Sequence, residues 1–495
     1  MSFAKIYTRG LLGLHAPLIE VEVHVSQGLP SLTIVGLPEA AVRESKDRVR
    51  SAIINSGFQF PTKRLTINLA PADLPKDGSR LDLPIALGIL IASGQIPENV
   101  TDQLEFIGEL ALDGQLRPIN GVLSIAIACQ QSGHQLILPE QNAQEASQLP
   151  GFQVFAAHHL KDVCEHLSSQ HPLQQYQASA TGPIDQYKFD LADVKGQLRP
   201  RRALEIAAAG GHSLLFKGPP GTGKTLLASR LASILPPLDM QENLEVASIY
   251  SVANSSHPFG QRPFRAPHHT ASAIALVGGG SHPKPGEITL AHLGVLFLDE
   301  LPEFDRKVLE VLRQPLESKE IVISRASRQI TFPANFQLIA AMNPCPCGYA
   351  FNQDIRCQCS ADAIKRYQNR ISGPLLDRID LHIDVPPLQA HELQDTSPVE
   401  NSQTVRQRVI QAYEQQMQRQ QCLNHALTPQ QLEQFACLDA QAQKIMEMAQ
   451  QRLNLSARAY HRVLRVARSI ADLSQHTDIQ SQHLTEALSY RAQQG

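Results

Sequence analysis

The stretch LLFKGPPGTGKT, residues 214–225, decides the fold of this chain. It joins an apolar run, residues 214–217, to a glycine-rich loop and then to residues 225–235, whose apolar spacing predicts a helix. Residues 218–225 follow the pattern G-x4-G-K-[ST], which is typical of a phosphate-binding loop between a strand and a helix. A glycine-rich turn without a ligand is the alternative.

The residue types in this loop suit a nucleoside triphosphate and its metal. Glycines allow several backbone N–H groups to point at one spot, and the following helix directs its positive end there. Lys224 adds a positive charge for the β- and γ-phosphates, and the Thr225 hydroxyl is a Mg²⁺ ligand. The predicted ATP-binding residues are Gly218, Pro219, Pro220, Gly221, Thr222, Gly223, Lys224 and Thr225.

Two further apolar runs end in polar residues that fit the same chemistry. Residues 295–298 lead into Asp299 and Glu300, so Asp299 is expected to hold Mg²⁺ through water and Glu300 to polarise the attacking water. Residues 336–342 lead into Asn343, which can orient that water. Read alone, the acidic pair also suits the start of a helix and Asn343 also suits a turn. Together with the phosphate loop, they predict hydrolysis of ATP.

The composition supports a large globular protein. With 495 residues, 42% of them hydrophobic and 18% charged, the chain is long enough for several domains and apolar enough to fill their cores. Its apolar runs are shorter than the ~20 residues of a membrane span, and its beginning lacks a signal-type apolar core, so a soluble, cytoplasmic protein is expected. The formal net charge of −3 excludes a global attraction for polyanions, so any contact with nucleic acid must be local.

Sequence patterns divide the chain into three domains and a linker. Residues 1–168 alternate β-type and helical stretches, and residues 169–187 are polar without apolar periodicity. Residues 188–386 alternate short apolar runs with helices, which predicts a wound parallel sheet. Residues 387–495 show amphipathic helical patterns without a convincing strand, which predicts a helical lid. The expected fold class is α/β, with a lid of helices at the C-terminus.

Four of the cysteines cluster in the motifs C-P-C and C-Q-C, at Cys345, Cys347, Cys357 and Cys359. Four thiolates can enclose a tetrahedral Zn²⁺, although a one-residue spacing is tighter than the usual C-x2–4-C. The alternative is a set of buried or redox-sensitive free thiols. The few cysteines elsewhere in so long a chain do not suggest a disulfide scaffold.

Four longer stretches carry a family resemblance. They are RPFRAPHHTAS (262–272), KPGEITLAHLGVLFLDELPEF (284–304), AAMNPCPCGY (340–349) and ISGPLLDRIDLHIDV (371–385). In these stretches the chain resembles the magnesium-chelatase-like group of AAA+ ATPases and, within it, the YifB/ComM family, over essentially its whole length. The resemblance implies an AAA+ P-loop core with magnesium-chelatase-type insertions that assembles as a homo-hexameric ring.

The resemblance also assigns roles to two arginines. Arg378, in the motif LLDR, corresponds to an arginine finger that reaches the γ-phosphate of the neighbouring subunit, and Arg458, in the motif SARA, corresponds to sensor 2. A cation supplied across an interface makes hydrolysis depend on assembly. The alternatives are a surface ion pair of Arg378 with Asp377 or Asp380, and a sensor role for Arg462 or Arg465 instead.

The first domain resembles the proteolytic domain of the Lon family. The motifs PKDG (75–78) and GELALDGQLRP (108–118) carry this resemblance. An active member has a serine at the position of Arg80 and a lysine close to that of Leu123, while Ser79 is displaced by one position and lacks a general base. The resemblance therefore implies a non-proteolytic platform for assembly or for guiding DNA.

Two insertions are candidates for gripping a polymer. The stretch IVISRASRQITF reads as a β-hairpin with Arg325 and Arg328 at its turn, and in this family such a hairpin faces the central pore. A second loop contains Lys284. Arginines on a hairpin can bind phosphates without reading bases, and six copies in a ring concentrate their charge. An ordinary solvated hairpin is the alternative, and the pair His268 and His269 favours a structural role over a metal site.

The family implies an ATP-dependent DNA helicase or translocase that promotes branch migration of recombination intermediates during natural transformation. Expected partners are single-stranded or branched DNA, further copies of the chain and recombination proteins. Three other classes remain as alternatives. A metal-chelatase-type motor needs partner subunits, a protein-remodelling motor usually presents an aromatic pore residue, and an active Lon-type protease needs the serine and lysine that this chain lacks.

Overall fold

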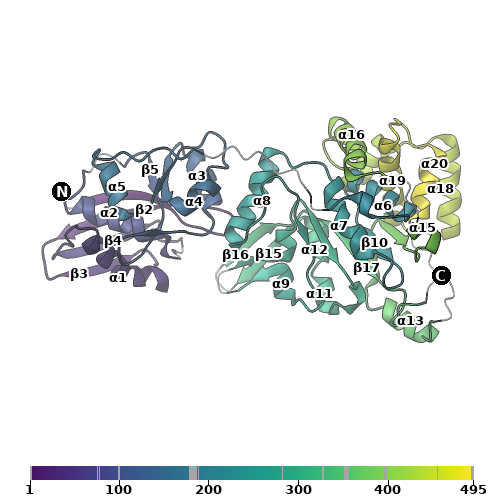
Figure 1. The fold of residues 1–495 in the computed structure, drawn as a ribbon, viewed down its shortest axis with the longest axis horizontal. Coiled ribbons are helices and arrows are strands. Elements are labelled where there is room, and N and C mark those ends of the chain that lie inside the picture. Colours follow the sequence, from purple (N-terminus) through teal and green to yellow (C-terminus); the bar gives the residue numbers. More distant parts are fainter. Residues whose placement is uncertain are drawn as a thin grey trace. The chain divides into compact units, whose positions relative to one another are not determined.

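The structure is a computed structural model that describes residues 3–74, 76, 78–97, 101–177, 187, 189–280, 283–325, 328–350, 356–394, 399–453 and 455–491. The chain divides into two compact units, one made of Met1–Pro183 with Met240–Phe259 and the other of Ile184–Asp239 with Gly260–Gly495 (Figure 1). The domain boundaries expected at residues 168, 187 and 386 stay predictions, and much of the expected linker lies outside the described residues.

The first unit is built on a mixed β-sheet, as its alternating sequence pattern predicts. The strands lie in the order β3-β4-β2-β1-β5-β8-β9, with antiparallel pairing around β2 and parallel pairing elsewhere. Helix α2 is apolar and buried from end to end, because it packs against β1, β2 and α1. The elements are β1 (Phe3–Arg9), β2 (Leu18–Ser26), β3 (Ser31–Val35), α1 (Ala40–Asn55), β4 (Arg64–Ala70), α2 (Asp82–Ala92), β5 (Leu104–Phe106), β6 (Glu109–Leu110), β7 (Leu116–Arg117), α3 (Val122–Gln131), β8 (Gln135–Pro139), α4 (Glu140–Ala146), β9 (Val154–Ala157) and α5 (Leu160–Leu167).

Helix α8 (Met240–Ala253) comes from the middle of the second unit's sequence but belongs to the first unit. It packs against α3, and the backbone carbonyl of its Ser251 accepts the N–H of Gly121 at 3.1 Å. The Ser251 hydroxyl accepts the N–H of Leu123 at 3.4 Å, and Leu244 packs against the apolar cluster around α3 and β8. The core domain expected from the sequence includes this helix, whereas the division into compact units assigns it to the Lon-like part.

The second unit contains the wound parallel sheet that the sequence predicts. Its strands lie in the order β11-β14-β17-β10-β18, and every neighbouring pair is parallel. Strands β14 and β17 are buried throughout and, apart from Gln337 at the start of β17, apolar, which is the pattern of a sheet covered on both faces. The strands are β10 (Leu214–Lys217), β11 (Phe264–Arg265), β12 (Gly278–Gly279), β13 (Lys284–Pro285), β14 (Val295–Leu298), β15 (Glu320–Arg325), β16 (Arg328–Pro333), β17 (Gln337–Met342) and β18 (Leu381–Asp384).

Helices connect these strands and continue into the C-terminal region. Most of the region after β18 is helical, as expected from its amphipathic patterns. The helices are α6 (Leu198–Gly210), α7 (Lys224–Ile234), α9 (Ala273–Val277), α10 (Glu287–Leu290), α11 (Arg306–Glu310), α12 (Arg313–Ser318), α13 (Ala361–Gln368), α14 (Gly373–Leu376), α15 (Ala390–Gln394), α16 (Ser402–Gln420), α17 (Pro429–Phe435), α18 (Ala440–Leu453), α19 (Ala457–Leu473) and α20 (Ser481–Ser489).

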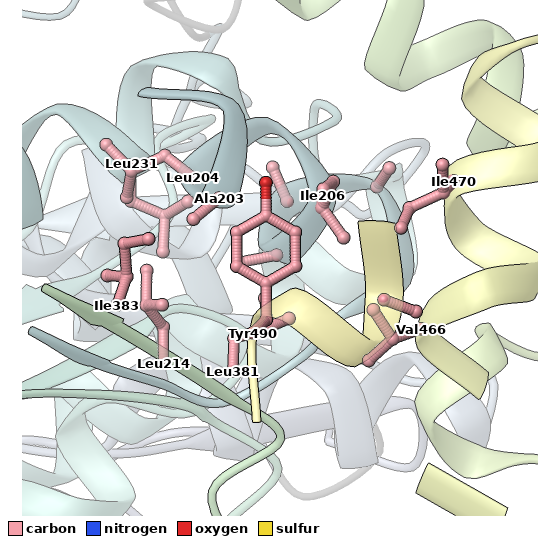
Figure 2. Packing of buried hydrophobic residues seen from close by; sticks show 14 of the residues in the cluster. Ala203, Leu204, Ile206, Leu214, Leu231, Leu381, Ile383, Val466, Ile470 and Tyr490 are labelled. Carbon is pink, nitrogen blue, oxygen red and sulfur yellow. The ribbon is translucent and has the colours of Figure 1, made fainter. Parts of the chain in front are cut away.

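The C-terminal helices share one hydrophobic core with the parallel sheet. A single cluster of buried residues runs from β10 and β18 through α6 into α16 and α19. Figure 2 shows the Tyr490 ring, which follows α20, among Ile206, Leu381 and Val466. The Tyr490 carbonyl also accepts the backbone N–H of His382 at 2.7 Å. The C-terminal helices thus contact β18, which pairs with β10, the strand that leads into the phosphate loop.

Candidate active site

Three neighbouring strands bring the predicted nucleotide-binding residues to one edge of the parallel sheet. Strand β10 pairs with β17, and β17 pairs with β14, so their carboxyl ends lie side by side. The phosphate loop follows β10, Asn343 follows β17, and Asp299 follows β14. This edge is where open parallel sheets bind their ligands.

The phosphate loop depends on glycine for its backbone shape. Gly221 has a φ of 77° and Gly223 a φ of 83°, in the left-handed region that glycine adopts without strain. At Gly218, an added Cβ would lie 2.3 Å from the Val385 carbonyl oxygen after the adjacent strand, so a larger residue would push the strands apart. Helix α7 begins at Lys224, directly after this loop.

The Lys224 side chain folds back over the loop. Its Nζ donates to the carbonyl oxygens of Gly218 and Pro219 at 2.8 and 2.7 Å, and to Asn343 Oδ1 at 3.2 Å. Burial lowers the pKa of Lys224, while the carboxylates of Asp299 and Glu300 oppose that shift. A buried ammonium held mainly by carbonyl oxygens is well placed to exchange them for phosphate oxygens.

Thr225 and Asp299 form the expected metal-ligand pair. The Thr225 hydroxyl donates to Asp299 Oδ2 at 2.6 Å, and the other carboxylate oxygen accepts the backbone N–H of Glu300 at 2.9 Å. Hydroxyl and carboxylate oxygens are the donors that Mg²⁺ takes in nucleotide sites. The residues present therefore fit Mg²⁺.

Glu300 has a partner that the sequence analysis missed. The residue has a φ of 52°, which is unusual for a non-glycine residue and is a kind of strain that clusters at functional sites. His269 Nδ1 lies 3.3 Å from Glu300 Oε2, and the His269 ring also meets the Phe304 ring edge-on. The structural role expected for the histidine pair stays a prediction, and at His269 the structure adds a contact with the predicted catalytic carboxylate. The only sequence signal for the contact between His269 and Glu300 is that His269 lies in the stretch 262–272, which carries the family resemblance.

The side chain of Arg378 is only 14% exposed and pairs with Glu317 on α12, not with Asp377 or Asp380. Its Nη1 donates to the Pro374 carbonyl at 2.7 Å, and its Nη2 pairs with the Glu317 carboxylate. An open pocket adjoins it, lined by Glu310, Arg313, Gln314, Glu317, Ser318 and Arg378. The guanidinium of this half-buried arginine is therefore paired with one exposed carboxylate beside an open pocket.

Arg458 is exposed in the first turn of α19, while the three later arginines of this helix are engaged inside the unit. Arg465 donates to the Leu427 carbonyl, and Arg468 pairs with Asp472. Burial lowers the pKa of Arg462, and the charge of Asp380 opposes that shift. Among these arginines, exposure favours Arg458 as the one available to a ligand.

The four clustered cysteines come together as expected for a metal site. Their sulfur atoms all lie within 4.8 Å of one another. The backbone N–H of Tyr349 and the neighbouring thiols lower the pKa of Cys347 to about 6. The cluster directly follows Asn343, so it adjoins the predicted ATP site.

The predicted DNA-contacting residues lie on the expected kinds of element. Strands β15 and β16 form an antiparallel hairpin in which Arg325 and Arg328 are paired positions, and Ala326 and Ser327 at its turn lie outside the described residues. Lys284 is exposed on β13. The hairpin itself is confirmed, while contact with DNA stays a prediction.

In the protease-like site of the first unit, Ser79 has a carboxylate partner that the sequence analysis did not predict. The Ser79 hydroxyl donates to the Glu109 carboxylate, and Leu123 is fully buried in α3. Pro75 and Asp77 of the PKDG motif lie outside the described residues. The expected lack of proteolysis stays a prediction.

Comparison with known families covers both units. Residues 190–393 match the family described as "Magnesium chelatase, subunit ChlI", residues 21–142 match "Subunit ChlI of Mg-chelatase", and residues 399–491 match "Magnesium chelatase, subunit ChlI C-terminal". Among the described residues, no helix combines the length and the apolar content needed to cross a membrane.

Similar proteins extend over the full chain. Competence protein ComM of Haemophilus influenzae is 51% identical, with 99% of this chain and 98% of that protein covered. YifB of Escherichia coli is 50% identical, with 99% and 97% covered. Lon protease 2 of Bacillus subtilis is 27% identical over 173 residues, 32% of this chain and 31% of that protein. Together with the parallel sheet and the phosphate loop, these matches show that the chain belongs to the YifB/ComM family of magnesium-chelatase-type AAA+ proteins with a Lon-protease-like domain.

Proposed function

We propose that this chain is an ATP-dependent DNA helicase or translocase that works as a homo-hexameric ring and promotes branch migration of recombination intermediates during natural transformation. The observation that carries the proposal is the convergence of Lys224, Asn343 and the Thr225–Asp299 pair at the ends of three adjacent parallel strands. The magnesium-chelatase family match supports an ATPase. The name of the Haemophilus influenzae relative, a competence protein, supports the biological setting.

Hydrolysis is proposed to use these residues in distinct roles. Lys224 exchanges the loop carbonyls for oxygens of the β- and γ-phosphates, and the N–H groups at the start of α7 bind the same phosphates. Glu300 accepts a hydrogen bond from the attacking water and takes its proton as the γ-phosphoryl group transfers to the water oxygen. The Asn343 amide orients that water, and His269 fixes the Glu300 carboxylate.

Two metals are proposed on the strength of their donor sets. Thr225 and Asp299 would hold Mg²⁺, which would neutralise charge on the phosphate oxygens. Zn²⁺ is proposed for the thiols of the cysteine cluster, since four thiolates are a common structural zinc set.

The ring is proposed because the ATP site needs a group from a neighbouring chain. Arg378 would leave Glu317 for the γ-phosphate bound by the next subunit, Arg458 would act as sensor 2, and both roles need a ring. A residue of one chain that serves the site of the next implies a head-to-tail interface, and such interfaces close into rings.

DNA is proposed as the polymer that the ring moves. Arg325 and Arg328 on the hairpin and Lys284 on β13 are the proposed phosphate contacts. The net charge of −3 means that attraction must come from such local groups, so binding should weaken steeply with salt. The Lon-like unit is proposed as a non-proteolytic platform for assembly or for guiding DNA. The proposed compartment is the cytoplasm, and recombination proteins are the proposed further partners.

Strand displacement from forked and three-stranded DNA tests this function. The wild type should displace the labelled strand with Mg²⁺ and ATP, while Lys224→Ala should lose at least about 10²-fold of the rate, because one preorganised cation at the phosphates is removed. Lys444→Ala, an exposed lysine on α18, is the matched control and should retain the wild-type rate.

Two results would contradict the proposal. Displacement that persists in Lys224→Ala would separate the activity from this ATP site. ATP turnover stimulated by an unfolded protein or a porphyrin, but not by DNA, would favour a protein-remodelling or chelatase-type motor.

A further inference from the structure

The segment between Asn343 and Arg370 contains the four clustered cysteines, and both of its ends lie beside the predicted ATP site. Strand β17 ends at Met342, Cys345 and Cys347 follow within a few residues, and Cys357 and Cys359 directly precede α13. Ser360 caps the N-terminus of α13 by accepting the N–H of Ala363 at 3.2 Å. The four thiols thus bring together the residues that follow β17 and the residues that precede α13.

The sulfur positions match a tetrahedral metal site. Zn–S bonds of about 2.3 Å in a regular tetrahedron place the sulfur atoms about 3.8 Å apart. In this structure, Cys345 and Cys357 sulfurs are 3.9 Å apart, Cys347 and Cys357 sulfurs are 3.7 Å apart, and Cys345 and Cys347 sulfurs are 3.3 Å apart. The shortest of these separations joins the cysteines with one residue between them, where the chain limits the spacing. The fourth sulfur, that of Cys359, lies within 4.8 Å of the other three, and four thiolates gathered in this way suit Zn²⁺.

The first half of the cluster packs against the phosphate loop. Gly348 has a φ of 86°, and an added Cβ there would lie 2.7 Å from Pro220 Cδ. Cys345 is fully buried, and its sulfur accepts the backbone N–H of Ala350 at 3.3 Å. The turn that carries two of the thiols therefore touches the ATP-binding loop directly.

The end of α13 contacts the catalytic residues from the other side. Burial raises the pKa of the Tyr367 hydroxyl and the nearby backbone of Asn343 lowers it. Gln368 Nε2 donates to the Pro344 carbonyl at 3.1 Å, directly after Asn343. Arg370 Nη1 donates to the Pro302 carbonyl at 3.3 Å and pairs with Glu303 at 2.9 Å, in the turn that follows Glu300. The end of α13 and the residues just after it thus contact both the turn after Asn343 and the turn after Glu300.

We infer that a Zn²⁺ ion bound by Cys345, Cys347, Cys357 and Cys359 acts as a clasp that fixes α13 against the ATP site, so that the metal is required to position Asn343 and the Glu300 turn for hydrolysis. This inference rests on the proposed ATPase site. On binding, protonated thiols release their protons and the thiolates take up the ion. The phosphate loop is also fixed at both ends, by β10 before it and α7 after it, so loss of zinc should reduce turnover much more than ATP binding.

Metal content and ATPase kinetics of the full-length protein test the clasp. Elemental analysis after purification under reducing conditions should find about one zinc per chain, the content of one four-thiolate site. The double variant Cys357→Ser/Cys359→Ser should lose the zinc and at least about tenfold of kcat, while its affinity for a fluorescent ATP analogue changes less than threefold. Cys437→Ser, an exposed thiol on another part of the chain, is the control and should keep both zinc and turnover.

A second variant keeps the test decisive if the double variant fails to fold. Gln368→Ala leaves all four thiols in place but removes the hydrogen bond from α13 to Pro344. It should keep one zinc per chain and lose turnover severalfold. Protein without zinc, or full turnover in the zinc-free double variant, would overturn the clasp. These assays contain no DNA, so their outcome is independent of whether DNA is the substrate.

Discussion

Arg378→Ala is expected to lower ATP turnover by at least about 10³-fold while leaving ATP binding within a few-fold of the wild type, as loss of an arginine finger does. The physical reason is that the finger neutralises charge that develops in the transition state, whereas the phosphate loop and Lys224 hold the ground state. In the single chain the guanidinium is held by exposed Glu317 and by the Pro374 carbonyl, so no buried network should collapse on its removal. Steady-state turnover and nucleotide titration on the assembled protein measure the two effects.

Arg313→Ala is the matched control for this prediction. Arg313 lines the same open pocket and pairs with Glu310 at 2.7 Å, so its loss removes a similar charge from the same surface. It should change turnover only modestly. If Arg313→Ala lost most of its ATP turnover and Arg378→Ala lost little, Arg313 would be the arginine finger and Arg378 would not.

Glu300→Gln is expected to reduce hydrolysis by about 10²–10⁴-fold, the usual contribution of a positioned general base, while ATP still binds. The amide keeps the shape of the side chain but cannot accept the proton of the attacking water. Because Thr225, Asp299 and Lys224 are unchanged, the variant should accumulate as an ATP-bound form. Single-turnover hydrolysis and the amount of nucleotide retained after gel filtration measure this result.

Glu433→Gln, on the exposed face of α17, controls for the change of charge and should behave as the wild type. Turnover by Glu300→Gln close to the wild-type rate would remove Glu300 from the chemistry. In that case the left-handed backbone of Glu300 and its contact with His269 would serve the fold of this loop and not the reaction.

The sequence was most informative where local pattern determines structure. The phosphate loop needs glycines at positions with positive φ, and Gly221 and Gly223 adopt them. The apolar runs that predicted β10 and β14 coincide with those strands, because buried parallel strands are continuous apolar runs. Parallel order then places Asn343 and Asp299 beside the loop, so the centre of the site follows from short motifs.

Contacts between distant segments were not predictable in the same way. His269 and Glu300 meet through a loop whose path no periodicity encodes, and Arg378 pairs with Glu317 on α12 rather than with its sequence neighbours Asp377 or Asp380. Helix α8 was expected in the ATPase core, but its packing partner is α3. Each of these depends on which surfaces meet in three dimensions, and a single sequence does not record that.

The central claim, that each ATP site is completed by the next chain, is tested most directly by mixing two inactive variants. Lys224→Ala keeps the finger but lacks the lysine of the phosphate loop, and Arg378→Ala keeps the loop but lacks the finger. In rings assembled at random from equal amounts, one interface in about four joins an intact loop to an intact finger, so ATP turnover should recover to about a quarter of the wild-type rate. Turnover that stays at the sum of the two separate variants would contradict a shared site.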